Sequence, residues 1–215
     1  MTQEDSREKA KEWLSGIERH KSRSEKFHFD VSSSALLVLD MQNYFLKEDS
    51  HAYVPSSPAI IPNVIDLVDY FRKNNRPVIF TRHSLEDGEE VGIMSRWWRD
   101  VVKEGTPEAE IASELKPENS ERVIRKTRYS AFANTDLEKT LRDEGVRSLV
   151  ISGVTTHLCC DSTARDAFMK DFEVYFVVDA TVSWTEDLHL ASLKTLSDGF
   201  VMPVSTDEIV GGSEG

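Results

Sequence analysis

Short apolar runs of strand length recur along the chain and alternate with segments of helical spacing. A continuous apolar run of this length is typical of a strand buried in a parallel sheet. The runs that predict strands lie at residues 35–39, 77–81, 122–125, 147–152, 174–178 and 200–202.

Apolar residues at helical spacing between these runs predict helices. Such helices are expected over 63–74, 136–144, 163–169 and 187–196, with a loop over 49–62. Residues 84–119 hold Gly, Pro and the Trp97-Trp98 pair, and predict long loops with short helices. The alternation predicts an α/β fold in three layers (α/β/α): a doubly wound, Rossmann-like, mostly parallel sheet of about six strands.

The pattern predicts one α/β domain over residues 31–210, with a helical arm over 1–30 and a loose tail over 211–215. In the arm, Trp13, Leu14 and Ile17 fall at helical spacing, with Ala10 just before them. This indicates an amphipathic helix that lies on the domain or on a partner subunit. A lid over the active site is the second interpretation.

Charge and cysteine content narrow the possible partners. The chain has 26 Lys and Arg against 38 Asp and Glu, a net charge of −12, which disfavours nucleic acid and anionic membranes. No apolar run approaches the ~20 residues of a membrane span, and the charged N-terminus has no apolar signal core. The two cysteines are adjacent, so we expect free thiols and a cytoplasmic location.

Polar residues follow three of the predicted strands. Asp40 follows 35–39, Lys126 follows 122–125, and the turn that bears Cys159 follows 147–152. Because parallel strands end at the same edge of a sheet, these groups can meet if their strands are near neighbours.

A thiol needs a base and a stabiliser before it acts as a nucleophile. Asp40 can take the proton, Lys126 can hold the charge, and backbone N–H groups of the turn can hold an oxyanion. A position near a helix N-terminus is expected to lower the pKa of Cys159. Taken singly, the three residues have plain structural interpretations: a cap, a surface charge and a small buried residue.

Four motifs extend this pattern. They are Leu-Val-Leu-Asp40-Met-Gln-Asn-Tyr-Phe45, Val-Ile-Arg-Lys126-Thr-Arg-Tyr-Ser-Ala-Phe132, Gly153-Val-Thr-Thr-His-Leu-Cys159 with Ser162-Thr-Ala-Arg-Asp-Ala-Phe168, and Val178-Asp-Ala-Thr181 with Ser205-Thr-Asp-Glu208. In this order and spacing the chain resembles the isochorismatase-like cysteine hydrolases over roughly residues 35–209. That family includes nicotinamidases, N-carbamoylsarcosine amidase, ureidoacrylate amidohydrolases and isochorismatases.

The resemblance implies a catalytic triad of Asp40, Lys126 and Cys159 that works through a thioester. It also implies a cis Val154–Thr155 peptide, with the N–H groups of Thr155 and Cys159 as the oxyanion hole. Cys160 takes no family role. The residues expected to bind substrate are Phe45, His83, Trp98 and Tyr129, and together with Trp97 they suggest an aromatic-lined, partly polar pocket.

Three segments, residues 126–132, 168–171 and 189–194, look closest to the isochorismatase branch of the family. Enzymes of that branch cleave a vinyl ether and carry glycine at the position of Cys159. The branch's substrate-binding glutamine corresponds to His83 here. We therefore expect a hydrolase of C–N amide or ureide bonds, with a vinyl-ether hydrolase as the alternative. A redox sensor using Cys159 and Cys160, and a binding protein without turnover, are alternatives of another class.

The resemblance also bears on metals and assembly. Nicotinamidases bind a metal through an Asp-x-His pair. Two residues after Asp66 this chain has Val68 in place of histidine, so neither a metal nor another cofactor is expected. His51 is expected on the loop surface. The partners predicted are a small-molecule substrate and further copies of the chain in a homodimer or homotetramer, with the Trp13 helix and the Trp97 loop as candidate contacts.

Overall fold

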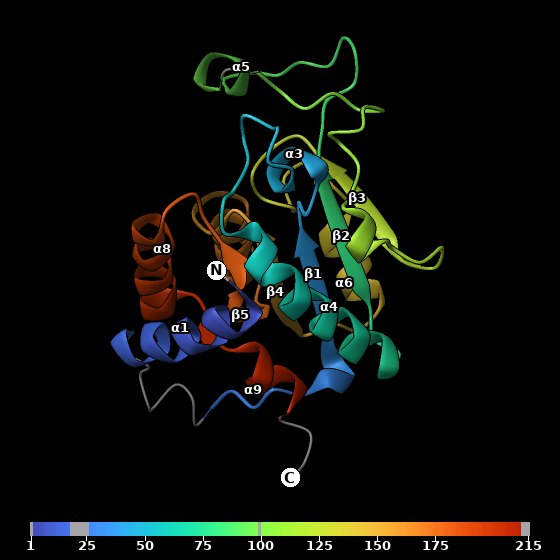
Figure 1. Ribbon diagram of the computed structural model, residues 1–215. Helices are drawn as coiled ribbons and strands as arrows, with labels where there is room; N and C mark the ends of the chain where they lie inside the picture. Colours follow the sequence, from blue (N-terminus) through green and yellow to red (C-terminus); the bar gives the residue numbers. More distant parts are fainter. Residues whose placement is uncertain (1, 18–25, 99, 212–215) are drawn as a thin grey trace.

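A six-stranded sheet forms the centre of the fold (Figure 1). The computed structural model describes residues 2–17, 26–98 and 100–211. Every pair of neighbouring strands is parallel, in the order β3-β2-β1-β4-β5-β6. The strands are β1 (Ser34–Leu39), β2 (Val78–His83), β3 (Arg122–Lys126), β4 (Ser148–Val154), β5 (Glu173–Val182) and β6 (Met202–Val204).

Helices cover both faces of the sheet, as alternate residues of β1 show. Leu37 and Leu39 pack in one apolar cluster with α6 (Leu137–Asp143), α7 (Asp161–Met169) and α8 (Glu186–Gly199). Leu36 and Val38 pack in the other with α4 (Ser57–Lys73) and α9 (Thr206–Val210). Burial on both faces explains the continuous apolar runs. The predicted three-layer, doubly wound fold is confirmed.

Three predicted boundaries were wrong. Helix α4 begins at Ser57 inside the predicted loop, because Pro58 lies in the first turn, where a helix tolerates the missing N–H. Strand β5 continues past residue 178, because the chain shifts register and pairs again with the end of β4. Strand β6 lies at 202–204 and not at 200–202. Among the described residues of 84–119, the helical elements are α5 (Met94–Trp97) and the short turn Ser113–Leu115, as predicted.

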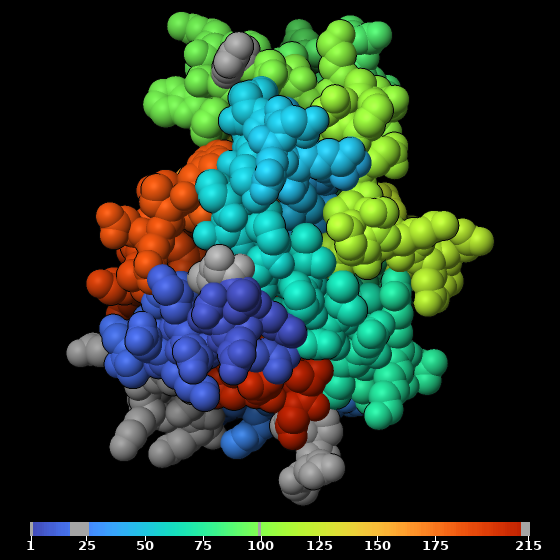
Figure 2. Space-filling model, viewed as in Figure 1, coloured from blue at the N-terminus to red at the C-terminus, as the bar shows by residue number. Residues whose placement is uncertain are grey.

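Helix α1 (Gln3–Gly16) packs on the α/β domain, and Figure 2 shows it against α4 and α9. Its Ala10 and Trp13 are buried in the cluster with α8. No α1 residue lines the cavity described below, so the lid interpretation was wrong. The division into arm, domain and tail stays a prediction, and residues 18–25 and 212–215 lie outside the described residues. Among the described helices, none is long and apolar enough to cross a membrane.

Strands β1 and β4 approach closely at Gly153. Its φ is +113°, and a Cβ there would lie 2.1 Å from the carbonyl oxygen of Leu39. Glycine is therefore required at this point, where strands β1 and β4 both end near the site.

Candidate active site

A buried ion pair lies at the carboxyl edge of the sheet. Lys126 Nζ is 2.7 Å from Asp40 Oδ2, and both side chains are fully buried. The lysine comes from β3 and reaches across β2 to the end of β1. Lys126 Nζ also donates to the Arg128 carbonyl at 3.0 Å and lies 3.4 Å from Cys159 Sγ. The four strands concerned are contiguous, as the sequence required.

The neighbouring strand fixes the Asp40 carboxylate. The Thr81 hydroxyl donates to Asp40 Oδ1 at 2.7 Å, and the Asp40 N–H donates to Thr81 Oγ1 at 3.2 Å. A buried carboxylate needs such partners to remain charged. One oxygen is thus held by the Thr81 hydroxyl and the other by the Lys126 ammonium.

The turn with the thiol follows β4 directly. The Val154–Thr155 peptide is cis, as the resemblance implied, and residues 156–160 form a single π-helical turn, η3 (Thr156–Cys160). The Thr155 carbonyl accepts from the N–H groups of Leu158 and Cys160. Cys159 faces the cavity, whereas Cys160 packs in the apolar cluster below, so the adjacent thiols occupy different surroundings.

Burial raises the pKa of the Cys159 thiol, and the Asp40 carboxylate raises it further, while Lys126 opposes both. The predicted lowering of this pKa was therefore wrong: desolvation outweighs the helix terminus. Burial alone lowers the pKa of Lys126, but Asp40 and Cys159 outweigh it and raise the pKa on balance. The resting site therefore holds a neutral thiol beside a charged lysine.

A cavity of about 320 Å³ opens above Cys159. Phe45, His83, Trp98, Tyr129 and Thr155 line it with Cys159, and Asp40 and Lys126 lie buried beneath. Trp97 does not line it; its side chain is 75% exposed. The lining residues that sequence reasoning missed include Tyr44, His51, Met94, Asp100, Leu158 and Trp184.

Aromatic side chains form one wall. Trp98 Nε1 donates to the Tyr129 hydroxyl at 2.8 Å, and the Trp98 and Trp184 ring centroids are 6.0 Å apart. Trp184 follows the carboxyl end of β5, the same signal that marked Asp40 and Lys126. It was missed because β5 was expected to end at residue 178.

The outer wall is polar. The Tyr44 hydroxyl donates to Asp100 Oδ1 at 2.6 Å, and His51 Nε2 lies 3.2 Å from each of these groups. His51 is exposed in its loop, as expected, and it also lines the rim of the cavity. Over the described ranges, no three His, Cys, Asp or Glu side chains converge as metal ligands would, so these residues do not fit a metal.

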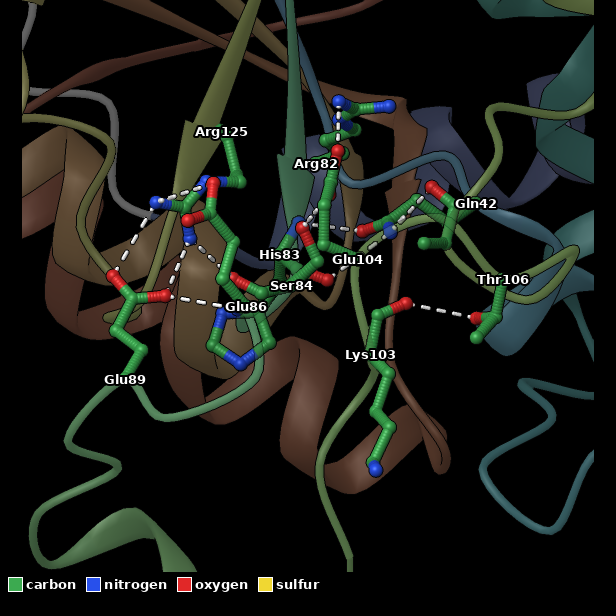
Figure 3. Close-up of polar contacts among 11 residues, drawn as sticks. Gln42, Arg82, His83, Ser84, Glu86, Glu89, Lys103, Glu104, Thr106 and Arg125 are labelled. Atoms are coloured by element: carbon green, nitrogen blue, oxygen red, sulfur yellow. Dashed lines mark hydrogen bonds and ion pairs between the residues drawn. The ribbon is translucent and has the colours of Figure 1, made fainter.

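His83 is held by its backbone (Figure 3). Its N–H donates to Gln42 Oε1 at 2.7 Å, and Gln42 Nε2 donates to the His83 carbonyl at 3.1 Å. Its ring Nδ1 is buried without a hydrogen-bond partner in the described part of the chain. Burial lowers the pKa of His83 to about 4, and Lys126 adds to the shift. A neutral imidazole therefore faces the cavity.

Ion pairs tie the irregular segment to the sheet (Figure 3). Glu104 accepts from the Arg82 guanidinium and from the Ser84 hydroxyl. Arg125 pairs with Glu89 at 2.7 Å. These contacts join the segment that carries Trp98 to the ends of β2 and β3.

Comparison with known proteins decides the family. Residues 34–208 match the isochorismatase domain family. The chain belongs to the isochorismatase-like hydrolases. It is therefore a hydrolase, and the resemblance seen in the motifs is confirmed.

Relatives of this isochorismatase-like hydrolase differ in their named activities. It is 37% identical to Nicotinamidase 3 of Arabidopsis thaliana over 179 residues, which cover 82% of this chain and 86% of that protein. It is 30% identical to the isochorismatase of Bacillus subtilis over 182 residues, 84% of this chain and 58% of that protein. A cysteine hydrolase from Pseudomonas syringae pv. phaseolicola 1448A superposes with a TM-score of 0.82 at 26% identity, covering 86% and 94% of the two chains.

Proposed function

We propose that this isochorismatase-like hydrolase cleaves a C–N amide or ureide bond of a small molecule through a thioester on Cys159. One observation carries the proposal. Cys159 Sγ faces the cavity and lies 3.4 Å from Lys126 Nζ, which is itself paired with Asp40. A nucleophile, a base and a fixed positive charge thus meet beside a space for substrate.

The first step forms the thioester. Cys159 Sγ attacks the substrate carbonyl carbon as its proton passes to the Asp40 carboxylate. The N–H groups of Thr155 and Cys159 stabilise the resulting oxyanion. Asp40 then gives the proton to the leaving nitrogen, and the C–N bond breaks.

The second step releases the acid. Water attacks the thioester carbonyl and loses its proton to Asp40, which returns a proton to the departing sulfur. Lys126 stays charged throughout and balances the negative charge as it moves between Asp40 and sulfur. The raised pKa of Cys159 supports attack coupled to proton transfer, in place of a preformed thiolate.

The cavity favours a substrate without negative charge. Its walls are largely aromatic, with Phe45, Trp98 and Trp184 among them. Among the described residues that line it, none is Lys or Arg. Isochorismate carries two carboxylates, and none of the described lining residues supplies a cation to offset the loss of their hydration. Neutral His83 supplies a polar anchor for an amide group instead.

The test compares the two adjacent thiols on a panel of neutral aromatic and aliphatic amides and ureides. Cys159→Ala is expected to lower kcat/KM at least about 10³-fold. Cys160→Ala, matched in size and position, is expected to keep wild-type turnover. Mass spectrometry of the wild-type protein with a slow substrate should find the acyl group on Cys159.

Other outcomes separate the alternatives. Full turnover of isochorismate by Cys159→Ala would support a vinyl-ether hydrolase. Reversible thiol oxidation that alters the protein, with Asp40→Ala and Lys126→Ala silent, would support a redox sensor. Ligand-induced stabilisation without product would support a binding protein.

A further inference from the structure

A buried polar contact joins the thiol-bearing turn to helix α8. Thr156, the first residue of η3, is fully buried, and its hydroxyl is 2.8 Å from His189 Nδ1. Thr156 adjoins Thr155 and lies three residues before Cys159. On the other side of the turn, His157 Nδ1 is 2.9 Å from the Ser183 hydroxyl. The turn is thus held from outside by two side-chain contacts.

Helix α1 closes over this contact from the far side. The Trp13 and His189 ring centroids are 4.5 Å apart. Trp13 Nε1 donates to Glu186 Oε1 at 3.0 Å, and Lys9 Nζ pairs with Glu186 Oε2 at 2.7 Å. α1 and α8 lie beside each other in Figure 1. The position of the His189 ring therefore depends on α1.

None of these groups touches the cavity, and the mechanism uses none of them. His189 is only 2% exposed. Burying a ring nitrogen costs free energy unless a hydrogen bond compensates for the lost hydration. Another buried polar side chain beneath α1, Asn63 of α4, donates to the Asp179 carbonyl of β5 and so ties helix to sheet. The Thr156–His189 contact differs in that it ties a helix to the turn that bears the thiol.

We propose that the Thr156–His189 contact, clamped by Trp13, positions the Thr155–Cys159 turn for reaction. His189, Thr156 and Trp13 are positioning residues, and α1 takes part in catalysis without approaching substrate. If the contact is lost, the Thr155 and Cys159 N–H groups shift relative to the oxyanion they hold. Substrate binding should change less than turnover, because Phe45, Trp98 and Trp184 come from segments outside the turn.

The test uses matched threonine variants and separates kcat from KM. Thr156→Val keeps the shape and removes the hydroxyl, and is expected to lower kcat about 10- to 100-fold with KM nearly unchanged. Thr156→Ser keeps the hydroxyl and should restore most of kcat. Thr140→Val makes the same change in α6, remote from the cavity, and should leave both constants unchanged whatever it does to Tm.

Trp13→Ala tests whether the contact between Trp13 and His189 holds the histidine ring in place. It also replaces Thr156→Val in the test if that variant does not fold. It should lower kcat in the same direction, and the double variant Trp13→Ala/Thr156→Val should lose little more than Thr156→Val alone. A wild-type kcat in folded Thr156→Val or Trp13→Ala would overturn the proposal. So would an equal rise in KM, which a general loosening of the fold would produce.

The positioning proposal rests on the proposed function, in which Cys159 is the nucleophile, but an experiment can contradict either one without the other. If the wild type hydrolyses no amide or ureide, the proposed function fails. Positioning is then measured by the rate of Cys159 alkylation by iodoacetamide. A changed rate in Thr156→Val, with Thr156→Ser and Thr140→Val at the wild-type rate, would support it. Equal rates in all four proteins would overturn it.

Discussion

Asp40 acts on two neighbours in opposite ways. It holds Lys126 in its charged form and disfavours the charged form of Cys159. The sequence predicted that these three residues can meet if their strands are near neighbours, because each follows a strand of one parallel sheet. The sequence could not predict whether the pKa of the Cys159 thiol is raised or lowered, because that depends on how deeply the fold buries the sulfur.

Removing the charge of Asp40 should separate reactivity from turnover. In Asp40→Asn, Lys126 acts on the thiol without an opposing carboxylate, so the pKa of Cys159 should fall. Iodoacetamide should then label Cys159 at lower pH than in the wild type, while hydrolysis is lost with the base. Rates measured against pH in a Cys160→Ala background, with adducts located by mass spectrometry, check this. An unchanged or upward-shifted labelling profile would contradict the charge balance derived from the structure.

The buried histidines should make the protein less stable in acid. Burial lowers the pKa of His189 to about 4, so the unfolded state binds more protons between about pH 6.5 and pH 4. Its contribution is fully present above pH 6.5 and is lost as the pH falls, by about 2 to 3 kcal/mol at pH 4.5. His83 acts in the same direction.

Asp179 acts in the opposite direction. Burial raises the pKa of its carboxyl to about 6, so its contribution to stability grows as the pH falls below 6. Urea unfolding at pH 7 and pH 4.5 measures the net change. His189→Gln should reduce the loss of stability in acid. An unchanged pH dependence in this variant would show that His189 does not titrate as its burial requires.

At the scale of elements, apolar runs located all six strands and most helices. The errors arose where tertiary contacts decide. Strand β5 extends because β4 offers a second stretch of pairing, and α4 begins early because Pro58 suits a first turn. No local pattern indicated the π-helical turn η3, which follows the end of β4 directly.

Gly153→Ala tests that close approach. The new Cβ would lie 2.1 Å from the Leu39 carbonyl oxygen and 2.7 Å from the Leu39 nitrogen, so β1 and β4 must separate. We expect a loss of more than about 4 kcal/mol in the free energy of unfolding, or no folded protein.

Gly88→Ala is the control, since its φ is also positive but nothing lies within 4 Å of the new Cβ. It should cost about 1 kcal/mol. Chemical unfolding measures both variants, and similar losses would show that backbone conformation matters here and the contact with Leu39 does not.

At the scale of the whole molecule, the cavity is built from segments far apart in sequence. Phe45 follows β1, Trp98 comes from the irregular segment, and Trp184 follows β5. Composition and periodicity predicted the layers around the site but not this wall, because irregular segments have no repeating pattern to read. Assembly into a homodimer or homotetramer and the cytoplasmic location stay predictions.

The contact between α1 and α8 has a consequence for biosynthesis. Trp13 and its partner Glu186 are 173 residues apart in the chain. At about 5 to 20 residues per second, a ribosome makes α1 roughly 9 to 35 s before the helix that covers it. Helix α1 can dock on α4 and β5 before then, but its contacts with Glu186 and His189 form only after α8 has been made. The turn with Cys159 therefore reaches its final setting only when synthesis is nearly finished.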